Sequence, residues 1–248
     1  MTKRELLKKI FVIAFPASVQ FIVQYVQMST DMAFVGHYNS AGLSAIQNAR
    51  VSYFLFLSFF MSFSTGTNIL IAQTLGAKQP DRAHRIAETS LCYNQIIGLA
   101  YLVFWLLFGR SVLMALGARG EILDSSAVYI RIISLQFLID GMVLTANAIF
   151  QGRGNTMPIT IGSAIRALVN VPLDYAMIFG KWGFPEMGIA GAAWATVMSG
   201  FMGSGVILWL LARDQRFPIT LRGMLRPASE LYANVIKIGI PAGVEMMI

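Results

Sequence analysis

Long apolar stretches separated by short polar segments run along the whole chain. They cover residues 10–35, 46–75, 89–116, 126–150, 157–180 and 187–212, and a further stretch begins near residue 234. An α-helix needs roughly 18 or more apolar residues to cross the hydrocarbon layer of a membrane, and the six complete stretches are long enough. The pattern predicts an all-α integral membrane protein, in which a six-helix bundle is followed by the start of helix 7.

The amino-acid composition supports a membrane protein. Hydrophobic residues make up 56% of the chain and charged residues 12%, whereas soluble domains average about 25% charged residues. The net charge of +7 would also suit a nucleic-acid partner. Basic residues in the cytoplasmic loops of a membrane protein explain the charge more simply, so we expect a lipid bilayer as partner and no nucleic acid.

The basic residues between the stretches concentrate in alternate loops. The N-terminal segment, residues 76–82, residues 151–158 and residues 213–232 hold most of them, whereas the intervening loops hold only Arg119 and Lys181. Cytoplasmic loops carry the excess of lysine and arginine. We therefore predict a multi-pass protein of the plasma (inner) membrane with a cytoplasmic N-terminus.

A weak internal repeat suggests how the chain is organised. Residues 13–22 can be aligned with residues 238–247, and Pro16 then falls on Pro241. Six helices repeated in parallel orientation are a transporter architecture. We interpret residues 1–212 as an amino-terminal six-helix transmembrane lobe, 213–232 as a cytoplasmic inter-lobe linker and 233–248 as the start of helix 7. The partner would be a missing carboxy-terminal lobe of the same protein.

Two aspartates lie inside the apolar stretches, where an ionisable residue is costly and usually marks a cavity or a partner. Asp31 lies in the first stretch, and Asp174 lies one helical turn after Asn170 in the fifth. At ~1.5 Å rise per residue these three and Thr196 of the sixth stretch fall at a similar depth. Their oxygen atoms suit a small cation such as Na⁺. Alternatively, two neighbouring carboxylates in a low dielectric form a proton carrier.

Other embedded polar residues have less specific interpretations. Gln20, Gln24, Gln27 and Asn147 are candidates for a substrate path, with hydrogen bonding between helices as the alternative. Asp140 falls at a different depth, and we interpret it as structural and paired with Arg131 or Arg166. The role of Glu245 in the seventh stretch stays open. The stretches contain no nucleophile–base pair or metal triad, which disfavours an intramembrane enzyme.

Several segments together resemble the multidrug and toxic compound extrusion (MATE) family. They are residues 16–36, 73–78, 151–158, 170–174 and 188–196, in the family's order. The resemblance implies twelve helices in two six-helix lobes that alternate access by rocking. It also implies cation-coupled (Na⁺ or H⁺) antiport, with no other cofactor, that exports amphipathic and often cationic compounds. On this reading Asp31, Asn170, Asp174 and Thr196 form the cation site of the amino-terminal lobe.

A lipid-linked precursor flippase of the same superfamily is the alternative function. Such proteins tend to have a strongly cationic cavity for pyrophosphate. We expect Arg166, and at most Arg131 beside it, to be embedded in this chain, which disfavours the flippase.

Overall fold

The computed structural model describes residues 3–38 and 40–245, apart from the side chains of residues 3–17, 40–43, 45, 48, 55 and 243–245. Within those ranges the chain is helical and has no strand. The helices are α1 (Lys3–Tyr38), α2 (Ser40–Gly76), α3 (Pro80–Ala115), α4 (Gly120–Ile133), the 3₁₀ turn η1 (Ser134–Gln136), α5 (Phe137–Gly152), α6 (Met157–Ile178), α7 (Ile189–Ala212), α8 (Leu221–Met224) and α9 (Ser229–Glu245). All six predicted stretches are therefore helical, as the sequence indicated.

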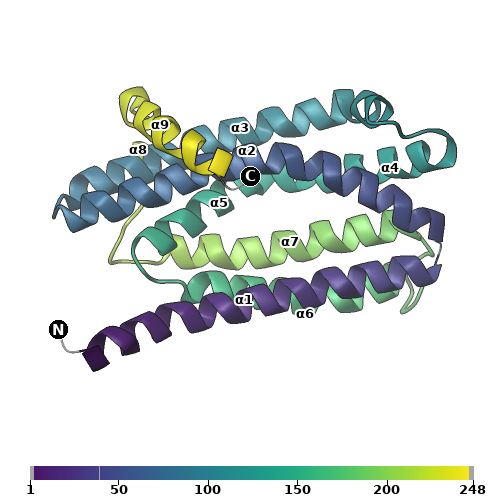
Figure 1. Ribbon diagram of the computed structural model, residues 1–248, viewed down its shortest axis with the longest axis horizontal. Helices are drawn as coiled ribbons and strands as arrows, with labels where there is room; N and C mark the ends of the chain where they lie inside the picture. The colour runs from purple at the N-terminus through teal and green to yellow at the C-terminus, as the bar shows by residue number, and fades with distance from the viewer. Residues whose placement is uncertain (1–2, 39, 246–248) are drawn as a thin grey trace.

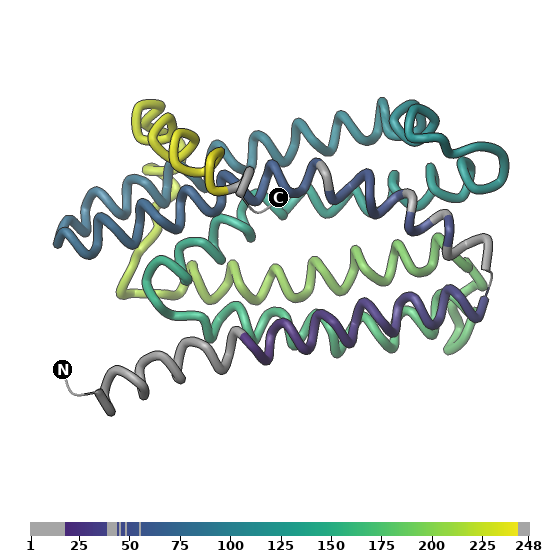
Figure 2. The backbone as a smooth tube through the Cα atoms, viewed as in Figure 1, coloured from purple at the N-terminus to yellow at the C-terminus, as the bar shows by residue number. Residues whose placement is uncertain are grey.

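The long helices form an elongated bundle (Figure 1). With α4 and α5 counted as one span, successive spans from α1 to α7 run in opposite directions (Figure 1). The turns α2–α3 and α5–α6 and the end of α7 lie at one end (Figure 2), and the start of α1 lies at the same end (Figure 1). The turns α1–α2, α3–α4 and α6–α7 lie at the other end (Figure 2). The loops rich in basic residues thus share one end of the bundle, while their placement in the cytoplasm stays a prediction.

Four helical segments are long and apolar enough to cross a membrane: Ala49–Gly76, Pro80–Ala115, Gly120–Gly152 and Ile189–Ala212. The two other predicted spans are α1 and α6, which carry the embedded glutamines, aspartates and Asn170. These two helices pack against each other, and α6 packs against α7. The helices that carry Asp31, Asn170 and Asp174 are therefore neighbours.

The fourth predicted stretch is one span with a local break between α4 and α5. The side chain of Gln95 on α3 bonds backbone groups at this break: its Nε2 donates to the carbonyl of Leu138 at 2.9 Å, and its Oε1 accepts from the amide of Met142 at 3.1 Å. Gly141 lies directly against the backbone of Asn94 and Gln95. A short 3₁₀ turn releases helical hydrogen-bonding groups, and within a membrane another helix must satisfy them.

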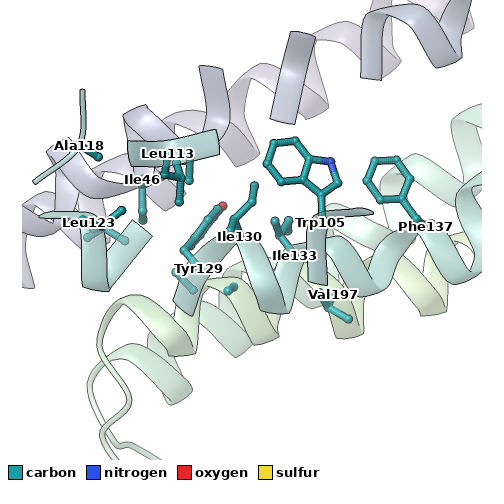
Figure 3. Packing of buried hydrophobic residues seen from close by; sticks show 14 of the residues in the cluster. Ile46, Trp105, Leu113, Ala118, Leu123, Tyr129, Ile130, Ile133, Phe137 and Val197 are labelled. Atoms are coloured by element: carbon teal, nitrogen blue, oxygen red, sulfur yellow. The ribbon is translucent and has the colours of Figure 1, made fainter. Parts of the chain in front are cut away.

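Apolar side chains of α2, α3, α4, α5 and α7 fill the centre of the bundle. Figure 3 shows Trp105 of α3 beside Ile130 and Ile133 of α4, with Phe137 of α5 beyond them. Trp105, Ile130 and Phe137 are each at most 1% exposed. Because lipid is as apolar as these side chains, close packing rather than exclusion from water holds the helices together.

The segment after α7 returns to the bundle and is hydrogen-bonded to α3. Glu88 Oε1 accepts from the Thr220 amide at 2.9 Å and from the Thr220 hydroxyl at 2.6 Å. Farther along α3, Asn94 Oδ1 accepts from the Tyr232 hydroxyl of α9 at 2.6 Å. The helix α9 begins at Ser229, inside the segment interpreted as a linker. The side chain of Glu245 lies outside the described residues.

Helices α6 and α7 approach closely through two glycines. A Cβ added at Gly203 of α7 would lie 2.6 Å from the carbonyl oxygen of Gly162 on α6 and 2.8 Å from the Cβ of Arg166. Small residues let membrane helices bring their backbones together. This contact fixes α6, and with it Asn170 and Asp174, against α7.

We expect Gly203→Ala to lower the stability of the purified protein by about 1–3 kcal/mol, because the added methyl forces two packed backbones apart. Gly205→Ala on the same helix is the matched control, since a Cβ there meets nothing within 4 Å. Thermal unfolding in detergent measures both variants. Equal stability of the two would contradict the proposed contact.

Candidate functional site

Asp31, Asn170 and Asp174 meet between α1 and α6. All three are buried, with relative exposures of 6% for Asp31 and 0% for Asn170 and Asp174. Asn170 and Asp174 stand one turn apart on α6, so their side chains lie on one face of that helix, and α1 places Asp31 opposite them. The depth argument from the sequence thus correctly anticipated that these three residues lie together.

Asn170 links the two carboxyl groups. Oriented with its nitrogen toward them, its amide donates to Asp31 Oδ1 at 2.8 Å and to Asp174 Oδ2 at 3.3 Å. Asp174 Oδ1 is buried and has no hydrogen-bond partner among the described residues. A buried oxygen atom without a partner is costly, so this atom is available to bind a proton or a cation.

The glutamines of α1 do not all lie at this site. Gln27 is buried, and its amide lies 2.9 Å from the Asn170 amide nitrogen. Gln24 is exposed and Gln20 half-buried on the described surface of α1. Asn147 is half-buried on α5, and within the described residues its Oδ1 has no hydrogen-bond partner. Among these four residues, only Gln27 directly contacts the carboxylate cluster.

Thr196 of α7 lies across a small void from Asp31. Both residues line this void of about 10 Å³, close to the smallest volume that holds one water molecule. The Thr196 hydroxyl donates to the Ala192 carbonyl at 2.9 Å. Its oxygen can still accept or coordinate through a lone pair, so the structure places the fourth predicted oxygen donor across a small void from Asp31.

Arg50 of α2 is a site residue that the sequence analysis missed. Its Nη2 lies 3.3 Å from Asp31 Oδ2, and its side chain is 27% exposed. The expectation that only Arg166, with Arg131 at most, would be embedded was therefore wrong: Arg50 is embedded and Arg131 is exposed. The position of Arg50 in the second apolar stretch was the available signal, but the sequence does not show which faces of α1 and α2 meet and so bring Arg50 to Asp31.

A second cavity adjoins Arg50 and reaches Arg166 of α6. It measures about 250 Å³ and is lined by Arg50, Tyr53, Leu57, Tyr129, Ile133, Gln136, Asp140, Leu144, Arg166 and Thr196. Asp140 Oδ2 accepts from the Tyr53 hydroxyl at 3.3 Å. Within the described residues no ion pair within 4.0 Å joins Asp140 to Arg131 or Arg166, but Arg166 lines the same cavity and its positive charge acts on Asp140.

The donor atoms of Asp31, Asn170, Asp174 and Thr196 suit a monovalent cation better than a transition metal. The described residues contain no group of three His, Cys, Asp or Glu side chains able to hold a metal ion. Two carboxylates, one amide and one hydroxyl are hard oxygen donors. The Asn170 amide presents its nitrogen to the carboxylates, so it must rotate before its oxygen can bind a cation.

Comparison with a protein-family model gives a match over most of the chain. The MatE family model matches residues 16–176, which include Asp31, Asn170 and Asp174.

Two curated relatives cover nearly the whole chain. A probable multidrug resistance protein NorM of Thermotoga maritima is 28% identical over 97% of the chain. A probable multidrug resistance protein YoeA of Bacillus subtilis is 26% identical over 94% of the chain. The chain spans about half the length of these relatives, 52% and 51% respectively.

Solved structures share the fold. A transporter described as a multidrug resistance MATE family member in an outward-facing conformation superposes with a TM-score of 0.86 at 24% identity. The match covers 97% of this chain and 52% of that chain. The helical bundle described above is thus the fold of one part of such a transporter.

Replacing Asn170 tests whether the amide holds the two carboxyl groups together. We expect Asn170→Leu, which keeps the side-chain volume, to lower stability by about 1–3 kcal/mol, because both buried carboxyl groups lose a donor. Asn68→Leu is the control, since the half-buried Asn68 donates only to Gln151 among the described contacts. Thermal unfolding measures the stability of both variants. A stability of Asn170→Leu equal to or above that of Asn68→Leu would contradict the account.

Proposed function

Because the chain belongs to the MatE family, the multidrug and toxic compound extrusion transporters, we propose that it forms the amino-terminal lobe of a cation-coupled exporter. The exported compounds are amphipathic and often cationic. The single observation that carries the proposal is the buried cluster of Asp31, Asn170 and Asp174 between α1 and α6. Such a cluster costs stability inside a membrane, and cation binding gives it a role.

The proposed transporter has a second lobe. The chain spans about half the length of its curated relatives, and residues 13–22 resemble residues 238–247. Two six-helix lobes that rock against each other expose a central path to each side of the membrane in turn. In this arrangement the N-terminus is cytoplasmic, and the membrane is the plasma (inner) membrane.

Cation binding would act on the contact between α1 and α6. Asp31 belongs to α1 and Asp174 to α6, so a cation shared by the two carboxylates draws both helices to one point. Asn170 and Thr196 add an amide and a hydroxyl oxygen to the shell. A cation shifts the lobes between conformations only to the extent that it binds one conformation more tightly than the other. A site shared by α1 and α6 binds a cation more tightly in the conformation that brings its two carboxylates together.

The coupling ion is Na⁺ or H⁺. Na⁺ requires the Asn170 oxygen to turn toward the ion, whereas a proton can be shared by the two carboxyl groups with the Asn170 amide left as it is. Each ion neutralises charge in the same place, so either one supports coupling.

The exposed face of α1 is the proposed entry to the substrate path. Gln24 is exposed there, beside the exposed side chains of Phe21, Tyr25 and Met28. Aromatic and methionine side chains adapt to varied apolar ligands, and a glutamine amide offers a hydrogen bond. This face suits amphipathic compounds.

The cavity beside Arg50 bears on the flippase alternative. Arg50 and Arg166 both line it, which is more positive charge than the sequence analysis expected. Asp140 lines the same cavity, and Asp31 pairs with Arg50. Because these carboxylates offset the two guanidinium groups, a pyrophosphate would find little net positive charge, and drug export stays the better-supported function.

Replacing Asp31 tests the proposal. In the complete protein, we expect Asp31→Asn to abolish export driven by a Na⁺ or H⁺ gradient, because the amide cannot hold the cation's charge. Efflux of a fluorescent cationic dye from proteoliposomes, with each gradient imposed separately, measures the effect and also identifies the coupling ion.

Asp124→Asn is the matched control for this experiment. Asp124 is an exposed aspartate in an ion pair with Arg110, so its replacement should leave efflux unchanged. Efflux by Asp31→Asn at the control's rate, with similar protein in the membrane, would refute the assignment.

A further inference from the structure

Arg50 occupies one side of the carboxylate cluster. Its Nη2 lies 3.3 Å from Asp31 Oδ2, while Asp31 Oδ1 accepts from Asn170. Both oxygens of Asp31 therefore already have partners from the protein itself. One of these partners carries a full positive charge.

This arrangement bears directly on any cation that binds Asp31. Two positive charges a few ångströms apart repel each other strongly where the dielectric is low. A coupling cation that reaches Asp31 must therefore either displace Arg50 or bind against its charge. Arg50 is in effect a competing ligand that is covalently attached to the protein.

Arg50 also has an alternative position. It lines the cavity of about 250 Å³, and Asp140, Tyr53 and Arg166 of α6 line the same cavity. In its present position Arg50 Nη1 is buried and has no hydrogen-bond partner within the described residues. The guanidinium group is thus only partly satisfied beside Asp31, and a second carboxylate is available across adjoining space.

We propose that Arg50 is a tethered cation that competes with the coupling cation for Asp31 and moves toward Asp140 when that cation binds. The inference rests on the proposed cation-coupled function and adds a residue that sets the affinity of its site. With the coupling cation absent, Arg50 neutralises Asp31. With the cation bound, the cation neutralises Asp31, and Asp140 becomes the carboxylate that faces Arg50.

A purely structural ion pair has different consequences. If Arg50 only orients Asp31, its removal leaves the carboxylate misplaced, and cation binding weakens or does not change. Competition predicts the opposite direction, because removing a competitor strengthens the binding of its rival.

The test measures cation binding to the complete purified protein without any transport. The readouts are ²²Na⁺ binding over a range of NaCl concentrations at constant ionic strength, and proton uptake over a range of pH. For Arg50→Gln we expect the half-saturating concentration of whichever cation binds to fall about tenfold, since a neighbouring positive charge is removed. Arg50→Lys keeps the charge and should stay within about threefold of the unmodified protein.

A second variant keeps the inference falsifiable if Arg50→Gln fails to fold. Asp140→Asn removes the alternative partner and should raise the half-saturating concentration about threefold, because Arg50 then remains on Asp31. Opposite shifts for Arg50→Gln and Asp140→Asn support competition. A half-saturating concentration that is unchanged or higher in Arg50→Gln, or unchanged or lower in Asp140→Asn, overturns it.

The outcomes also separate this inference from the proposed function. If the unmodified protein binds neither Na⁺ nor protons at Asp31 and Asp174, cation coupling itself fails, and the inference fails with it. If the protein binds a cation and the Arg50 or Asp140 variant shifts the wrong way, only the tethered-cation inference fails.

Discussion

The contact between Asp31 and Asn170 joins α1 and α6, the two helices that carry the buried carboxylate cluster. Asp31 comes from α1, Asn170 and Asp174 come from α6, and the three are buried together. Inside a membrane such groups must satisfy one another, because the hydrocarbon core holds no water and lipid chains cannot form hydrogen bonds. The requirement fixes the rotation of α1 relative to α6. The close approach of α6 to α7 at Gly162 and Gly203 then carries this constraint into the rest of the bundle.

The charges around this contact are arranged in a series. Asp174 has an oxygen atom with no partner among the described residues, Asp31 is shared between Asn170 and Arg50, and Asp140 lies across the cavity from Arg50. The series holds two carboxylates joined by the neutral Asn170 amide, then a guanidinium group and a third carboxylate. A change of charge at Asp31 therefore changes the position in which the neighbouring Arg50 side chain has its lowest energy, which is a physical basis for coupling between sites.

Much of this arrangement could be predicted from the sequence. The length of the apolar stretches predicted the helices, because the thickness of the hydrocarbon layer sets the length of a spanning helix. Counting residues at a constant helical rise placed Asp31, Asn170, Asp174 and Thr196 at one depth; the first three lie together, and Thr196 lies across a small void from Asp31. The depth of a residue along a spanning helix follows directly from its residue number, because the helical rise is constant. That depth was sufficient to group the residues of the carboxylate cluster.

The features that were missed depend on rotation and on contacts between helices. Arg50 was overlooked because pairing it with Asp31 requires knowing which faces of α1 and α2 meet. The expected partner of Asp140 was an arginine, whereas the structure gives Tyr53 of α2. The break at Ser134–Gln136 depends on Gln95 of another helix. None of these contacts leaves a periodic signal in one stretch of sequence.

The central claim is that Asp31 and Asp174 bind the coupling cation, and infrared difference spectroscopy of their carboxyl bands tests it most directly. Spectra of the complete protein would be recorded as Na⁺ is added and, separately, as the pH is lowered. The account predicts a change in the carboxyl bands with one of these ions, and loss of that change in Asp174→Asn. Identical difference spectra for the unmodified protein and Asp174→Asn would contradict it.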